Sequence, residues 1–191
     1  NINLKERQKL DFLKYEGPTD PVYTGSLGNI FSYKNFHLNI FMTYSFGNVL
    51  RLDPVFKSAY NDLSSMTKVF RNRWMRGGDE LITNVPTIID RYKYRKTSNV
   101  DRVYSAYNLS NVRVAKGDFI RLKEISLAYD FPKTWFSNTP INNLSVKLQA
   151  TNLFLLYADS KLNGQDPEFF NTGGVASPMP KQFTLTVKVG L

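Results

Sequence analysis

The last nine residues of the chain, 183–191, place the strongest constraint on its fold. Their side chains are apolar at every odd position and polar or glycine at every even position. Since successive side chains of a strand point to opposite faces, this segment predicts a β-strand with one apolar and one polar face. Lipid covers such a face in a membrane β-barrel, and a second sheet covers it in a soluble sandwich. The rest of the sequence has to separate these two folds.

The same alternation recurs upstream. It predicts a hairpin of two strands around a Lys34-Asn35 turn, and each strand spans about ten residues, the length that a tilted strand needs to cross a bilayer. Two further strands follow a long interruption, and a turn at 132–143 joins them. The predicted strands are 23–34, 36–47, 119–131, 144–151 and 183–191. The sequence therefore predicts an all-β, antiparallel chain.

The connections between these strands alternate in length. Those at 34–35 and 132–143 are short, whereas those at about 48–117 and 158–181 are long. Outer-membrane barrels have short turns on one side and long loops on the other, and a sandwich need not show this asymmetry. Within the first long connection we predict a helix over residues 55–74 and a loop over the polar run 95–102.

Composition excludes several kinds of site. The chain has 191 residues with no cysteine and one histidine, His37, so it predicts no disulfide, no thiolate metal site and no histidine-based catalysis. Its longest apolar run, 153–157, is far too short for a membrane helix. Charged side chains occupy residues 1–20 where a signal peptide would be apolar. We therefore expect either a cytoplasmic protein or a late part of a longer exported chain.

The basic excess is local. Residues 51–116 hold 13 Lys or Arg against 6 Asp or Glu, which accounts for +7 of the formal net charge of +9. A solvated basic loop explains this best. Attraction of anionic lipid headgroups or nucleic acid is the weaker alternative, and it rests on charge alone.

Five stretches, in order, resemble segments of one protein family. The most specific is Gly117-Asp118-Phe119-Ile120-Arg121-Leu122-Lys123-Glu124 with the strand that follows it, similar to the family's "G-S-F-L-R-L-K-N" strand. The others are the hairpin running from Tyr23 to Phe36, Arg73-Trp74 with Val85-Pro86, Asn152-Leu153-Phe154 with Asp166-Pro167-Glu168, and the segment from Pro178 to Leu185. The family that these stretches resemble is the SusC/RagA-like TonB-dependent transporters of the Bacteroidetes outer membrane.

The resemblance implies the C-terminal part of a barrel of about 22 strands. It implies import of oligosaccharides or peptides across the cell outer membrane, with TonB acting through a plug that these motifs do not include. A SusD-like surface lipoprotein would cover the extracellular loops, and lipid and the rest of the barrel would be the other partners. Residues 1–20 would lead in from the preceding barrel region, and residues 21–191 would be barrel. The alternative is a soluble β-sandwich that binds carbohydrate.

The predicted sites are contact surfaces, with no catalytic residue, cofactor, metal or nucleic acid. Asp166 and Glu168 could pair as catalytic carboxylates, but a turn at Asp166-Pro167 is favoured. Residues Thr184, Thr186 and Lys188 are predicted to face the lumen, and Leu185, Val187 and Val189 to face lipid. Packing of the loops on one another is the simpler role for the loop side chains that could touch substrate or lid, namely Arg73, Trp74, Arg76, Tyr104, Tyr107, Phe169 and Phe170.

Overall fold

The computed structural model describes residues 13–54, 68–89, 91–96, 99–170 and 179–191. The chain divides into two compact units. One contains the five long strands, and the other is built mainly from Val49–Ala115. Across the described ranges, none of the helices has both the length and the apolar character needed to cross a membrane.

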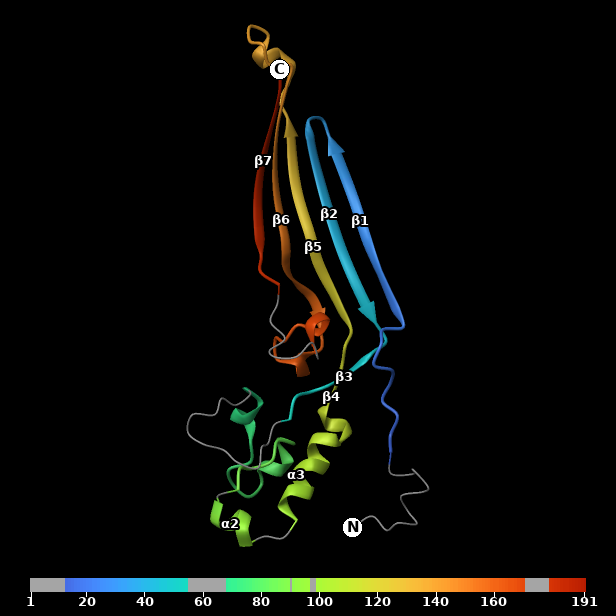
Figure 1. The fold of residues 1–191 in the computed structure, drawn as a ribbon, viewed down its shortest axis with the longest axis vertical. Helices are drawn as coiled ribbons and strands as arrows, with labels where there is room; N and C mark the ends of the chain where they lie inside the picture. The colour runs from blue at the N-terminus through green and yellow to red at the C-terminus, as the bar shows by residue number, and fades with distance from the viewer. Residues whose placement is uncertain (1–12, 55–67, 90, 97–98, 171–178) are drawn as a thin grey trace. The chain divides into compact units, whose positions relative to one another are not determined.

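Five of the described strands form a single antiparallel sheet in the order β1-β2-β5-β6-β7 (Figure 1). The predicted hairpin around Lys34-Asn35 is present, and Lys34 adopts the left-handed conformation, with φ of 52°, that closes such a tight turn. The prediction of antiparallel strands is confirmed, and the strands are Tyr23–Tyr33 (β1), Phe36–Phe46 (β2), Phe119–Asp130 (β5), Asn143–Ala158 (β6) and Gln182–Gly190 (β7).

The register of the sheet gathers apolar side chains on one face. Leu185 pairs with Leu148, Leu148 with Leu127, Leu127 with Leu38, and Leu38 with Phe31, so one row crosses all five strands. Directly paired residues share a face, and the alternation of each strand then extends the row into a continuous apolar surface. This surface is open: Leu185 is 63% exposed and Leu148 is 59% exposed.

Three irregularities interrupt the ladder in the first half of β5. Lys123 is an extra residue relative to β2, and the β5–β6 register shifts between Ile120 and Arg121 and again between Leu122 and Glu124. The last of these shifts coincides with Asn152, whose φ of 53° lies in the left-handed region that Asn tolerates better than most residues. Such bulges shift the inward–outward alternation locally, which is why alternation predicted a strand only over 144–151, although β6 continues to Ala158.

The Gly117-Asp118 pair that begins the most specific motif joins β5 to the end of β2. The amide of Gly117 donates to the carbonyl of Asn48, and a Cβ at position 117 would collide with the Asn48 side chain. Asp118 Oδ1 accepts from the amide of Gly47 at 2.7 Å. Glycine at position 117 leaves room for the Asn48 side chain, and Asp118 supplies an acceptor for the Gly47 amide.

The second unit combines a small sheet with short helices. Its strands β3 (Val49–Arg51) and β4 (Val114–Lys116) pair with each other. Two small apolar cores hold it together, one around Phe70 and Val85 and one around Val100 and Tyr104. The helices are 3-10 helices η1 (Lys68–Asn72), η2 (Asp79–Leu81) and η3 (Asn111–Arg113), and α-helices α2 (Arg91–Lys96) and α3 (Val100–Leu109).

Two predictions for this unit need comment. The loop predicted over 95–102 is wrong, because α2 ends at Lys96 and α3 begins at Val100. Buried Val100 and Tyr104, with half-buried Tyr107, lie at helical spacing along one face of α3, and the polar residues around them concealed that pattern. Of the helix predicted over 55–74, residues 55–67 lie outside the described part, and 68–72 form a 3-10 helix.

Candidate functional site: polar sheet face and loop anchor

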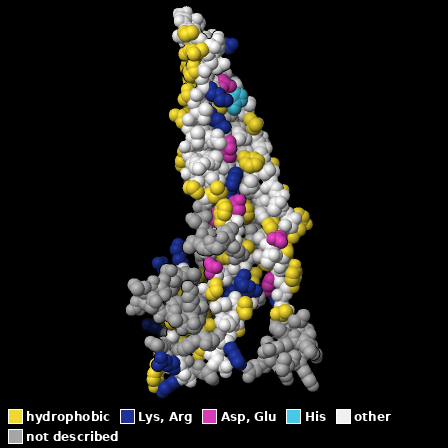
Figure 2. Space-filling model, in the orientation of Figure 1, with side chains coloured by type: hydrophobic (Ala, Val, Ile, Leu, Met, Phe, Trp, Pro, Cys, Tyr) yellow, Lys and Arg dark blue, Asp and Glu magenta, His cyan; other side chains and the backbone are white. Residues whose placement is uncertain are grey.

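The second face of the sheet is polar. Figure 2 shows basic and acidic side chains interleaved on the sheet, with hydrophobic side chains along its margins. Thr184, Thr186 and Lys188 lie on this face, because they pair with Gln149, Lys147 and Ser145. The predicted division of β7 into two faces therefore agrees with the register, since Leu185, Val187 and Val189 share the opposite face. Their assignment to lumen and lipid stays a prediction.

His37 belongs to a polar cluster at the hairpin end of this face. Its Nδ1 lies 2.9 Å from Ser32 Oγ and its Nε2 lies 3.1 Å from Asp130 Oδ2. These are the residue types of a hydrolytic triad, but the side chains of His37 and Asp130 are 40% and 58% exposed. Such an exposed pair is screened by water and is worth at most about 1 kcal/mol, so we interpret it as a tie between β1, β2 and β5.

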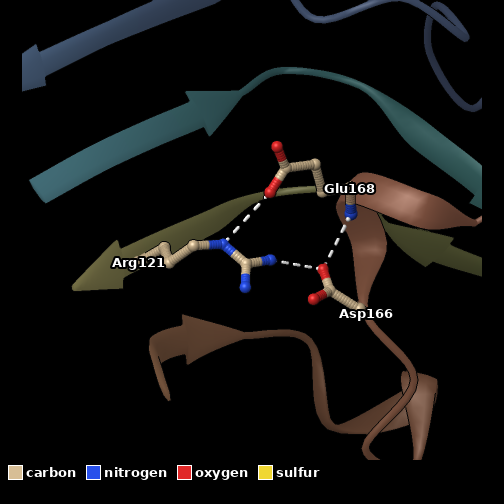
Figure 3. A network of polar contacts seen from close by, with 3 residues as sticks. All are labelled: Arg121, Asp166 and Glu168. Carbon is tan, nitrogen blue, oxygen red and sulfur yellow. Dashed lines mark hydrogen bonds and ion pairs between the residues drawn. The ribbon is translucent and has the colours of Figure 1, made fainter. Parts of the chain in front are cut away.

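The most deeply buried polar group of the sheet unit is an anchor made by Arg121, Asp166 and Glu168 (Figure 3). Arg121 lies on the polar face of β5, and its Nη2 is 2.5 Å from Asp166 Oδ1. Its Nε forms an ion pair with Glu168 Oε2 at 3.1 Å. The side chains of Arg121 and Asp166 are 2% and 0% exposed. The forked guanidinium thus holds two carboxylates of the β6–β7 connection against the sheet.

Local sequence explains why the two carboxylates converge. Asp166 precedes the 3-10 helix η6 (Pro167–Phe169), and its Oδ1 accepts from the amide of Glu168 at 3.1 Å. Proline at the first position suits a helix start, because its missing N–H would have no helical partner. The turn predicted at Asp166-Pro167 is therefore confirmed. Sequence reasoning missed its partner, Arg121, although the motif containing Arg121 had been singled out.

The loop side chains predicted to contact substrate or lid occupy different environments. Tyr104 is buried and donates its hydroxyl to the carbonyl of Thr87. Tyr107 packs against the core around Phe70, and Phe170 is buried. Arg73, Trp74 and Phe169 are half-buried and Arg76 is exposed. Because Tyr104 and Phe170 are buried, we interpret them as packing residues. Arg73, Trp74 and Arg76, in contrast, lie together in one turn.

A carboxylate organises that turn. Asp79 Oδ2 accepts from the amides of Met75 at 2.8 Å and Arg76 at 2.9 Å. These hydrogen bonds, that from Met75 foremost, hold the pKa of Asp79 below its usual range. The stabilisation from these two hydrogen bonds is therefore fully present above the unfolded-state pKa of about 3.9. It is lost as the pH falls through the lower pKa that Asp79 has in the folded state.

We expect the Met75 and Arg76 amides to be equally protected from hydrogen exchange at about pH 7 and pH 5, and to lose protection as the pH falls through the lowered folded-state pKa of Asp79. Protection factors corrected for intrinsic exchange measure this. Asp79→Asn is the matched control, since its amide oxygen accepts hydrogen bonds but does not titrate. Equal protection of both amides in the wild-type protein across this acid range would contradict the prediction.

Comparison with known proteins gives matches in sequence and in structure, although no family profile matches the chain. TonB-dependent receptor P39 of Formosa agariphila is 27% identical over 160 residues, covering 82% of this chain and 14% of that protein. TonB-dependent receptor P3 of the same organism is 27% identical over 155 residues, covering 81% and 14%. The chain therefore spans about one seventh of the length of the curated relatives it matches.

Solved structures give the same result for the fold. The RagAB peptide importer in its open-open state matches with a TM-score of 0.64 and 22% identity, over 93% of this chain and 18% of that chain. The RagAB peptide transporter matches with a TM-score of 0.61 and 24% identity, over 92% and 18%. The chain therefore has the antiparallel strand arrangement found in part of these importer chains, and its sequence is similar to part of TonB-dependent receptors. The resemblance to a portion of a SusC/RagA-like transporter is confirmed.

Proposed function

We propose that this chain is part of the wall of an outer-membrane importer that takes up oligosaccharides or peptides in a TonB-dependent manner. One observation carries the proposal: an antiparallel sheet of five described strands has a continuous exposed apolar face and a polar, charged opposite face. In a membrane barrel, lipid would cover the apolar face and an aqueous lumen would solvate the polar face. The matched relatives are receptors and importers rather than enzymes.

In this proposal the parts of the chain have separate tasks. Residues 21–191 supply barrel strands, and residues 1–20 lead in from the preceding barrel region. The connections at about 48–117 and 158–181 are extracellular and meet a SusD-like surface lipoprotein. TonB acts through a plug outside these residues. The Arg121 anchor keeps the second connection against the lumen wall, so that this connection has a fixed position beside the transport path.

The sandwich alternative requires a second sheet over the apolar face. Leu127, Leu148 and Leu185 are 45%, 59% and 63% exposed, which is the reverse of a sandwich core. A soluble protein with so large an exposed apolar surface would associate through it. The exposure of these apolar side chains therefore favours the barrel proposal over the sandwich.

Fractionation of the native source tests the proposal on the full-length protein. We expect this chain in the outer membrane, as part of a large species whose gel mobility changes on boiling, together with a co-purifying surface lipoprotein. A monomer of about this chain's mass in the soluble fraction, without detergent, would overturn the proposal and support the sandwich.

A further inference from the structure

A small pocket opens beside Arg73 in the second unit. It has a volume of about 420 Å³, and its lining residues all come from one stretch of the chain, namely Asn72, Arg73, Asp79, Ile82 and Thr83. A volume of this order is in the range of small-ligand sites. The described lining residues all belong to the unit built mainly from Val49–Ala115.

The walls of this pocket are held by hydrogen bonds on both sides. Asp79 fixes the backbone at Met75 and Arg76, as described above. Trp74 Nε1 donates to the carbonyl of Thr83 at 2.6 Å, and the amide of Trp74 donates to the carbonyl of Val85 at 3.1 Å. A ligand therefore meets a preformed site, which reduces the ordering that binding would otherwise require.

Arg73 supplies the positive charge of the described pocket lining, and Asp79 supplies a negative one. Its Nη1 donates to the carbonyl of Phe70 at 3.0 Å, which fixes the guanidinium without neutralising it. Within the described ranges no carboxylate forms an ion pair with Arg73, and Asp79, the acidic residue of the lining, spends its Oδ2 on two amides. A guanidinium has five N–H donors in a planar fork, a geometry that matches a carboxylate.

The residues around the pocket limit the chemical class of the ligand. The basic excess of residues 51–116 attracts anions to this unit. Ile82, which lines the pocket, and its neighbour Leu81 are 86% and 88% exposed, so apolar surface adjoins the charge. Among the described lining residues none is aromatic. Sugar rings commonly pack on aromatic faces, whereas peptide side chains pack equally well on aliphatic ones.

We propose that this pocket binds a carboxylate of a peptide substrate, with Arg73 as the carboxylate-binding residue and Ile82 as the apolar contact. The proposal deepens the importer function above and rests on it. It assigns the parent transporter a preference for acidic peptides. The basic excess of the loop then serves to concentrate such substrates at the entrance of the transport path.

Binding to the full-length transporter, purified with its associated lipoprotein, tests this proposal. The probes are two labelled peptides of equal length, one with Glu residues and one with Gln at the same positions. We expect the Glu peptide to bind more tightly, and Arg73→Gln to weaken its binding about tenfold or more while leaving the Gln peptide unchanged. Arg73→Lys keeps the charge without the fork, so its effect should be intermediate.

Arg71→Gln is the matched control, because it removes the same charge from the same segment at an exposed residue outside the pocket lining. Equal losses in the two variants, or equal binding of both peptides, would overturn the proposal and leave the importer function standing. Preference for an acidic oligosaccharide over the Glu peptide would overturn it as well. Absence of uptake of any peptide or oligosaccharide by cells carrying the wild-type transporter would count against the importer function itself. Thermal unfolding of each variant shows whether it has kept its fold.

Discussion

Replacement of Arg121 by Met is expected to release the β6–β7 connection from the sheet. The Asp166 side chain is 0% exposed, so the substitution leaves a buried carboxylate without its cation. Breaking a buried pair by removing one partner costs about 3–5 kcal/mol. Because the loss falls on one connection, we expect rapid proteolytic cleavage near residues 159–170 while the strands stay intact. Limited proteolysis of the protein in outer-membrane vesicles measures this.

Glu168→Gln is the internal control for the anchor. The Glu168 side chain is 37% exposed, so its ion pair with Arg121 is largely screened and should contribute about 0.2–1 kcal/mol. Cleavage should therefore be much slower than in the Arg121→Met variant. Combining Arg121→Met with Asp166→Asn removes the buried charge as well, and should recover part of the lost protection. Similar cleavage of Arg121→Met and wild type would show that other contacts hold the connection.

Substitution of Leu148 by Arg is expected to destabilise the barrel strongly. Leu148 lies in the middle of β6, on the apolar face, between its partners Leu127 and Leu185. An Arg on the lipid face near the bilayer midplane costs about 2–4 kcal/mol. We therefore expect a lower denaturant concentration for loss of the heat-modifiable gel species, and less protein assembled in the outer membrane.

Gln149→Arg is the matched control, since residue 149 is the next residue of the same strand and lies on the polar face, paired with Thr184. The two variants carry the same new side chain at nearly the same depth and differ only in the face that carries it. Equal destabilisation would contradict the assignment of lipid and lumen faces. Destabilisation of Gln149→Arg alone would mean that the two faces are reversed.

The strands could be predicted from the sequence because their signal is local. In β7 the polarity of each side chain indicates the face of the sheet on which it lies. The period-2 alternation in 183–191 was therefore enough to place the strand to within one residue at each end. The β6 strand shows the limit of this reasoning. The left-handed Asn152 and the register shift beside it break the alternation, and the second half of β6, up to Ala158, was therefore not predicted.

The anchor and the pocket could not be predicted in the same way. Arg121 and Asp166 are 45 positions apart, and nothing in either neighbourhood specifies the other. The sequence identified Arg73 as a possible contact but could not show that it lines a pocket with Ile82. In both cases the necessary information is a distance between residues that only the folded chain brings together.

The sequence by itself determined the type of element and its two faces, because strand alternation and turn residues act within a few positions of the chain. Its motifs also determined the family resemblance that the comparisons confirmed. Tertiary structure alone decided that β2 pairs with β5, which carboxylates meet Arg121, and which loop side chains are buried. Those outcomes depend on strand register and on the burial of charge. Both are properties of the assembled sheet and loops, and no local segment determines them.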